Sequence, residues 1–561
     1  AARASRTWHG RVDAHLASIS PRVPRYHDDG DVASMRASFA ALVRDLRRVM
    51  PGDFFQTTKR VVIEAGRGSG WALADSADLA GASSVRVVPW QTENRSPSGD
   101  GALVFSDAGE RHAEQKARAQ AAPQEQMSSP MRGFYPAYGV KHNYVKAVRA
   151  AQAAYGEELF DLHPASFAYP TEAEALQREL ETAPADQMWI VKPSRGFSGK
   201  GIYLMDRSDP LPDTSGGVEF IVQRYVRPLL AEGFKFDFRV YGLVLLNPLR
   251  VYVFNDGIVR LASVPYEHSK AGIANKCMHI TNSGYQRPHC AATYLPNSDA
   301  MERSFSHLWS VKKLVRHMQT ATGAVESDTW NGLGDVIARS ILAHDDYLLR
   351  LHTEAPYPQF QMFGPDLTYD DEGKPWIIEI NAFPTTTQCC PVDTQAKVRM
   401  LVDMWRMLGV TPRDREAYAS RARESIDAFC GAGGGGGAGG DVDAAAAGVE
   451  CTQEVREALW AYEDAHHERG GFSLAYPHPD TFDRVSHLGV SGLPTTRALA
   501  AYLRWKRAAG RLSPHELDVG SEHYPHSKRR ATAPRRGGSS RSNSNGGNGN
   551  GNGDGDGKMG P

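Results

Sequence analysis

Apolar and polar residues alternate along much of the middle of the chain, and this alternation predicts β-strands. In Phe234–Tyr241, phenylalanines and a valine fall on one face while Lys235, Asp237 and Arg239 fall on the other. Such a strand has one face in a core, and its charged face either meets solvent or lines a polar cleft. Further strands are predicted at residues 167–170, 188–193, 201–205, 219–223, 235–246, 250–255 and 258–262, with a hairpin turn at Asp256-Gly257.

The stretch Phe363–Pro384 predicts two strands joined by a turn rich in Asp, Gly and Pro. Glu379 and Asn381 share one face of the second strand, Ile378 points into a core, and Asp366 lies opposite on the partner strand. Two carboxylates and one carboxamide on a single wall suit Mg²⁺, which prefers hard oxygen ligands. An exposed hairpin with charges placed by chance is the disfavoured alternative, because the glutamate interrupts a core-like run.

Helical spacing of apolar residues marks a second set of elements. Thr171 and Asp393 are expected to cap two of these helices. An apolar strand at 60–65 precedes a glycine-rich loop at 66–70, for which a plain turn is favoured over a phosphate loop. The helices are predicted at residues 32–50, 144–155, 171–181, 393–408, 452–466 and 495–509. Strands and helices together indicate an α+β fold.

Length and composition limit the possible architectures. A chain of 561 residues is too long to fold around one simple hydrophobic core. The expected divisions are 1–52, 53–411 with a flexible insert at 91–132, a glycine-rich linker region at 412–449, a helical extension at 450–512 and a disordered tail at 513–561. A net charge of −1 provides no global basic field, so nucleic acid is not an expected partner. No apolar run spans a membrane and no signal peptide is evident, which predicts a cytoplasmic monomer without a membrane partner.

The 6 cysteines are few and lack a regular spacing, which predicts reduced thiols. A zinc site built from Cys277, His279, His289 and Cys290 is disfavoured, because the spacing matches no common zinc pattern. Cys389-Cys390 is interpreted as structural or incidental. No arrangement of a nucleophile with a general base stands above chance.

Several short segments carry residues suited to a nucleotide. Lys192 ends an apolar run and therefore needs an anionic partner, and Lys200 sits between two glycines whose backbone can approach phosphate. A hairpin with a surface lysine is the alternative. The connector Val222–Val226 offers backbone groups and Gln223 to an adenine. Thr281-Asn282 offers a hydroxyl and an amide, although a turn is the ordinary interpretation.

In this order, the segments WIVKPSRGFSGKGIYL, VQRYV, KFDFRVYGLV, NPLRVYVFNDGIVRLAS, HITN and FGPDL…GKPWIIEINAFP resemble the tubulin tyrosine ligase-like family. The resemblance implies an ATP-grasp fold, with mixed or antiparallel sheets enclosing a nucleotide cleft. It implies catalytic contacts from Arg239 and Arg260, and Mg²⁺ at Asp366, Glu379 and Asn381. Its implied ATP contacts are Lys192, Arg195, Gly196, Lys200, Gln223, Arg224, Tyr225, Val226, Lys235, Asp237, Thr281 and Asn282.

The resemblance further implies an ATP- and Mg²⁺-dependent ligase acting on tubulin in microtubules. Ala461–Pro477 resembles the extension that follows the core in glutamate-adding members, which implies transfer of free L-glutamate to tail carboxylates through an acyl phosphate. Leu308 stands where members often carry a lysine, so a glycine or tyrosine ligase stays open. A catalytically silent microtubule-binding protein is the alternative of another class. The implied locations are the cytoskeleton and the cilium, flagellum or basal body.

A basic helix at Thr495–Ala509 and a basic cluster at Lys528–Arg530 offer a grip for the acidic microtubule surface. A solvated helix face followed by a disordered tail is the equal alternative.

Overall fold

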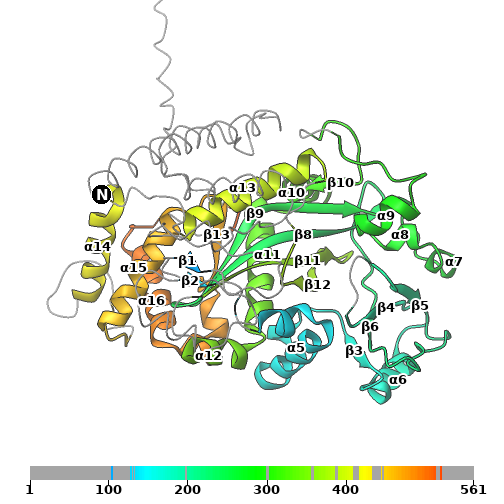
Figure 1. Cartoon of the computed structure of the whole chain (residues 1–561), viewed down its shortest axis with the longest axis horizontal. Helices are drawn as coiled ribbons and strands as arrows, with labels where there is room; N and C mark the ends of the chain where they lie inside the picture. The colour runs from blue at the N-terminus through cyan, green and yellow to red at the C-terminus, as the bar shows by residue number, and fades with distance from the viewer. Residues whose placement is uncertain are drawn as a thin grey trace, which may run out of the picture. The chain divides into compact units, whose positions relative to one another are not determined.

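Figure 1 shows the chain as a computed structural model. Contacts divide it into two units, Ala1–His526 and Ser527–Pro561, and every described residue belongs to the first. The structure describes residues 131, 133–195, 199–298, 302–354, 359–385, 389–408, 416–431, 444, 448–479, 481–512 and 518–520, and two short paired strands, β1 (Leu103–Val104) and β2 (Met127–Ser128). The helix predicted at 32–50, the strand at 60–65, the loop at 66–70 and the basic cluster at Lys528–Arg530 lie outside these residues.

The larger sheet is antiparallel and has the strand order β10-β9-β8-β11-β12, with β13 paired to β9 and β7 paired to β8. The apolar face of β8 behaves as its alternation predicts, since Phe236, Phe238 and Val240 are fully buried. The strands are β7 (Leu230–Ala231), β8 (Phe234–Leu245), β9 (Arg250–Leu261), β10 (Leu308–Ser310), β11 (Phe360–Tyr369), β12 (Pro375–Asn381) and β13 (Phe472–Tyr476).

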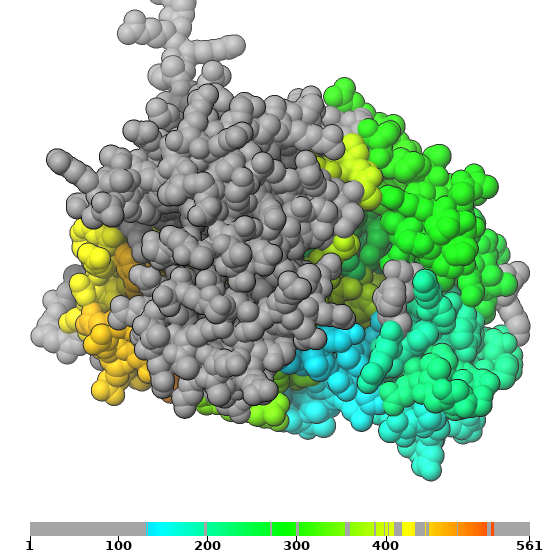
Figure 2. Space-filling view, viewed as in Figure 1, coloured from blue at the N-terminus to red at the C-terminus, as the bar shows by residue number. Residues whose placement is uncertain are grey.

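A smaller antiparallel sheet has the order β3-β6-β4-β5. Its strands are β3 (Ser166–Tyr169), β4 (Trp189–Pro193), β5 (Tyr203–Met205) and β6 (Phe220–Arg224). Beside it lie three short helices, α7 (Lys270–Ile273), α8 (Lys276–His279) and α9 (Ser283–His289). In Figure 2, the segment that holds these helices lies at the upper right of the view, and the small sheet lies below it. The two sheets and these helices together surround the site described below.

Most of the remaining helices pack around the larger sheet, whereas α6 (Ala173–Thr182) packs on the small sheet, where Leu176 and Leu180 meet Phe167 and Trp189. Trp309, Leu314, Val315 and Ile337 pack with the apolar face of β8 in one core. A second core joins the far halves of β8 and β9 to the C-terminal helices (Figure 1). The helices are α5 (Lys141–Tyr155), α6 (Ala173–Thr182), α10 (Val311–Thr322), α11 (Glu326–Leu342), α12 (Asp345–Glu354), α13 (Pro391–Met407), α14 (Glu416–Gly431), α15 (Gln453–His467) and α16 (Pro494–Ala508). Helices and antiparallel sheets together make an α+β fold, as predicted.

Three local predictions are wrong. Asp256-Gly257 is not a hairpin turn, because both residues lie inside the continuous strand β9. A Cβ on Gly257 would stand 1.9 Å from the carbonyl oxygen of Arg239, so the glycine permits close approach of two strands. Thr171 does not cap α6, which begins after Glu172 without a side-chain cap. Asp393 is not an N-cap, since α13 begins at Pro391.

The basic helix α16 has cations with partners inside the protein. Lys506 Nζ lies 2.6 Å from Glu463 Oε1, and Arg504 Nη2 lies 2.6 Å from Asp483 Oδ1. These ion pairs offset the positive charge that was predicted to face an acidic partner. Within the described ranges, no helix combines the length and apolarity that crossing a membrane requires.

Candidate functional site

An open cleft lies between the two sheets, and the α8–α9 segment contributes to its wall. Six cationic side chains and three carboxylates line it, so the cleft favours an anion overall. The charged residues are Lys141, Lys192, Lys200, Arg224, Lys235, Arg260, Asp237, Asp366 and Glu379. The uncharged residues include Gln223, Tyr225, Val226, Thr281 and Asn282, which were predicted from the sequence.

A network of ion pairs joins the neighbouring strands of the larger sheet. Asp366 receives two hydrogen bonds from Arg239, with Nε to Oδ1 and Nη2 to Oδ2 both 2.7 Å. Arg260 Nη2 lies 3.0 Å from Asp366 Oδ2, and Arg260 Nε donates to Asp237 Oδ1 at 2.5 Å. The hydroxyl of Thr281 also donates to Asp237. The two guanidinium groups outweigh burial and hold the pKa of the Asp366 carboxyl well below its usual range.

The wall of residues predicted to bind Mg²⁺ lies on the hairpin β11–β12. Asp366 pairs with Glu379 and Gly364 with Asn381 in the strand register. The register shifts after Asp366, so that Ile378 has no partner across the hairpin. Ile378 therefore lines the cleft beside Glu379, and the prediction that it points into the core is wrong.

The donor set of this wall suits a hard cation by its chemistry. The set has two carboxylates and one carboxamide: Asn381 Nδ2 lies 3.4 Å from Asp366 Oδ2, and Glu379 is the strand partner of Asp366. Lys141 Nζ lies 3.1 Å from Glu379 Oε2, so a cation bound there would compete with this lysine. No group of three or more His, Cys, Asp or Glu side chains in the described ranges is placed to hold a metal ion. Any three-ligand set in this wall would therefore need the Asn381 carboxamide.

Lys192 enters the cleft from β4 and is 5% exposed. Its Nζ donates to Gln223 Oε1 at 2.7 Å, which is a neutral acceptor. Burial lowers the pKa of Lys192 to about 8, with the Glu379 carboxylate acting against it and the nearby Lys141 and Lys235 acting in the same direction. Gln223 is fixed in turn, since its Nε2 donates to Ser166 Oγ at 2.8 Å.

Lys235 is the second buried lysine of the cleft, and it also donates to a neutral acceptor. Its Nζ lies 3.0 Å from the carbonyl oxygen of His279. His279 Nε2 lies 2.9 Å from the carbonyl oxygen of Gly272, so this nitrogen carries the proton and Nδ1 accepts from the Tyr225 hydroxyl at 2.9 Å. Burial lowers the pKa of His279 to about 4, which leaves the ring neutral at pH 7.

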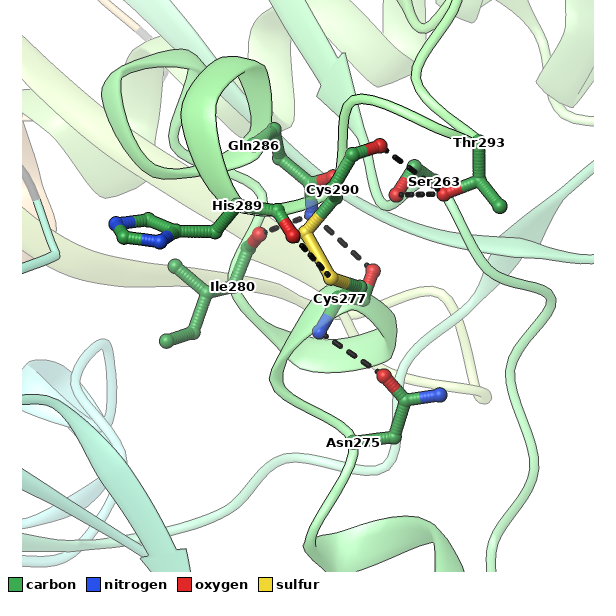
Figure 3. The surroundings of a disulfide bond; sticks show 8 residues. All are labelled: Ser263, Asn275, Cys277, Ile280, Gln286, His289, Cys290 and Thr293. Carbon is green, nitrogen blue, oxygen red and sulfur yellow. Dashed lines mark hydrogen bonds between the residues drawn. A yellow bond between two sulfur atoms is a disulfide. The ribbon is translucent and has the colours of Figure 1, made fainter.

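A disulfide bond joins Cys277 on α8 to Cys290, which directly follows α9, and so closes the loop that contributes to the cleft wall (Figure 3). Gln286 Nε2 donates to the carbonyl oxygens of Cys277 and Ile280 within this loop (Figure 3). A second disulfide joins Cys430 to Cys451. The prediction of reduced thiols is therefore wrong for these four cysteines.

The structure brings most of the predicted site residues together. Arg239 and Asn381 contact Asp366, although they are absent from the cleft lining. Arg195 is exposed and does not line the cleft, and Gly196 lies outside the described residues. Lys141 was missed, because it lies on α5 in a segment whose helical pattern gives no sign that it faces Glu379.

The model of the family described as "Tubulin-tyrosine ligase family" matches residues 134–417. The human protein named tubulin monoglutamylase TTLL4 is 33% identical over 289 residues, which are 50% of this chain and 23% of that protein. The Caenorhabditis elegans protein named tubulin polyglutamylase ttll-4 is 30% identical over 257 residues, covering 45% of this chain and 41% of that protein. The human protein named tubulin polyglutamylase TTLL5 is 27% identical over 285 residues, covering 50% and 22%. The matched region thus spans less than half of each of these relatives.

Proposed function

Because this chain belongs to the tubulin-tyrosine ligase family, we propose that it is an ATP-dependent ligase that adds glutamate to side-chain carboxylates of tubulin tails. Support for glutamate and tubulin comes from the names of the similar proteins. Support for the chemistry comes from one observation: two buried lysines in a single cleft donate only to neutral acceptors, opposite a wall of carboxylates. A cleft of this kind suits the phosphates of a nucleotide. We also propose that the two sheets form an ATP-grasp fold.

We assign roles to the residues of the cleft on the same basis. Lys192 and Lys235 bind phosphate oxygens, and Lys200, Arg195 and Gly196 supply further contacts to the nucleotide. Gln223 and the connector Arg224, Tyr225 and Val226 bind the base, while Thr281 and Asn282 border the ribose and phosphates. Asp366, Glu379 and Asn381 would hold Mg²⁺, which would supply positive charge beside the phosphates.

The proposed reaction needs no nucleophile from the protein. An oxygen of the acceptor carboxylate attacks the γ-phosphorus, so that ADP leaves and an acyl phosphate forms on the acceptor. The amine of free glutamate then attacks the acyl carbon, phosphate leaves, and an isopeptide bond results. Arg260 lines the cleft, and Arg239 pairs with the cleft residue Asp366. We assign to both arginines the stabilisation of negative charge and the positioning of the carboxylate network.

Mass spectrometry of tubulin tails tests this proposal directly. Microtubules are incubated with the protein, ATP, Mg²⁺ and one labelled amino acid at a time. We expect label from glutamate only, on a glutamate side chain of the tail and only when ATP is present. Label from glycine or tyrosine alone would reassign the amino acid, and microtubule binding without any label would favour the catalytically silent alternative.

A further inference from the structure

Two free thiols lie next to each other at the start of α13, in the connection that follows β12. Cys389 Sγ and Cys390 Sγ are 3.4 Å apart, and Cys389 is exposed while Cys390 is half-buried. Cys390 packs against a small apolar cluster that includes Val392 and Ala396, so its position is held by the helix it caps. The two sulfurs therefore differ in access to solvent although they belong to neighbouring residues.

Charged side chains of both signs surround the exposed cysteine. Arg287 on α9 and Lys397 place positive charge near Cys389. Asp393 opposes them, but its carboxylate also pairs with Lys397 at 2.7 Å and accepts from the backbone nitrogen of Cys389 at 3.0 Å. The hydrogen bond between the two thiols lowers the pKa of Cys389 against the opposing effects of burial and Asp393, and the same bond raises the pKa of Cys390.

From this geometry we propose that Cys389 and Cys390 form an oxidation site, at which a hydroperoxide converts the two neighbouring thiols into a disulfide. An exposed thiol with a second thiol in contact is the arrangement that two-electron oxidants attack first. The inference concerns the chemistry of the thiols alone, so it stands or falls separately from the proposed ligase activity.

The reaction balances with the peroxide as oxidant. The Cys389 thiolate attacks one peroxide oxygen, the O–O bond breaks, and a sulfenic acid and hydroxide form. The Cys390 sulfur, after losing its proton, attacks the Cys389 sulfur and displaces a second hydroxide. Two thiols and one hydrogen peroxide thus give one disulfide and two waters. The sulfurs approach from 3.4 Å to the bonded distance of about 2.05 Å.

The test uses the full chain with stoichiometric hydrogen peroxide at pH 7, followed by N-ethylmaleimide and peptide mass spectrometry. We expect the peptide that contains both cysteines to lose two hydrogen atoms and to take up no N-ethylmaleimide. In Cys390→Ser, oxidation of Cys389 should stop at the sulfenic acid, which dimedone traps. In Cys389→Ser, the rapid oxidation by hydrogen peroxide should be lost. Circular dichroism checks that both variants are folded.

Arg287→Leu supplies a second, independent measurement. Loss of the guanidinium should slow the oxidation of Cys389 about threefold for each unit by which its pKa rises, since lower thiolate content is partly offset by higher nucleophilicity. Arg178→Leu on the exposed face of α6 is the matched control and should leave the rate unchanged. The proposal is overturned if Cys389 reacts no faster than free glutathione, or if oxidation yields only disulfides between different molecules.

Discussion

Replacing Lys192 with methionine should stabilise the folded state and weaken nucleotide binding. One substitution should thus change stability and affinity in opposite directions. Methionine has a similar length and lacks the charge. A pKa lowered from 10.5 to about 8 corresponds to a cost of about 3 kcal/mol for keeping this buried ammonium charged at pH 7. Loss of the hydrogen bond to Gln223 offsets about 1 kcal/mol of the gain. We therefore expect the variant to be more stable than the parent by about 1–2 kcal/mol.

The stability difference between the methionine variant and the parent should depend on pH. Because the pKa of Lys192 is lower in the folded state, the unfolded chain holds more protons between about pH 8 and pH 10.5. The stability that this residue contributes consequently rises with pH across that window, and the advantage of the methionine variant shrinks there. Urea unfolding of the nucleotide-free protein at several pH values measures this difference.

Nucleotide binding should respond in the other direction. A lysine about 4 Å from a phosphate charge contributes at most about 4 kcal/mol at an effective dielectric constant of 20, and desolvation removes part of it. We expect the dissociation constant for ATP, measured by calorimetry, to rise about 100-fold, equivalent to about 2.7 kcal/mol. Lys146→Met on the exposed face of α5 is the control and should change neither quantity. A variant that is less stable at pH 7, or that binds ATP as tightly as the parent, would refute the reasoning.

Two further substitutions test the cleft, and a third tests the close contact between β8 and β9. Asp366→Asn leaves Arg239 and Arg260 without their shared carboxylate, so urea unfolding should show a loss of about 3–5 kcal/mol together with loss of ligation. Glu379→Gln removes one partly exposed ion pair and should cost less than about 1 kcal/mol, yet it should abolish Mg²⁺-dependent ligation; full retained activity would contradict the metal assignment. Gly257→Ala places a Cβ 1.9 Å from the Arg239 carbonyl oxygen, so thermal unfolding should show a loss of about 1–3 kcal/mol or more, whereas an unchanged melting temperature would exclude the close strand contact.

The sequence predicts those parts of the site that lie on strands. Alternation along β8 assigns Lys235 and Asp237 to the polar face, and the hairpin β11–β12 places Asp366 opposite Glu379, because both follow from a period of two residues. The same rule fails at Ile378, where a single bulged residue turns a core position toward the cleft. A bulge depends on the pairing of two strands and leaves no periodic signal.

Contacts between distant segments are the other part that the sequence does not reveal. The Asp256-Gly257 pair has the composition of a turn, and only the approach of β8 shows that its glycine serves close packing. Cys277 and Cys290 likewise lack a recognisable spacing, and the fold of α8 and α9 brings them together. Each of these features depends on which strands and helices become neighbours.

Two arginines and two lysines in and beside the cleft differ in their partners. Arg239 and Arg260 are paired with carboxylates within the protein, and they join β8, β9 and β11. Lys192 and Lys235 donate to an amide oxygen and a backbone carbonyl, so their charge is not cancelled by these contacts. A buried charge that keeps only neutral partners is costly, and an incoming anion relieves that cost. We therefore infer that the lysines supply the binding energy for phosphate, whereas the arginines act mainly through the geometry of the carboxylate wall.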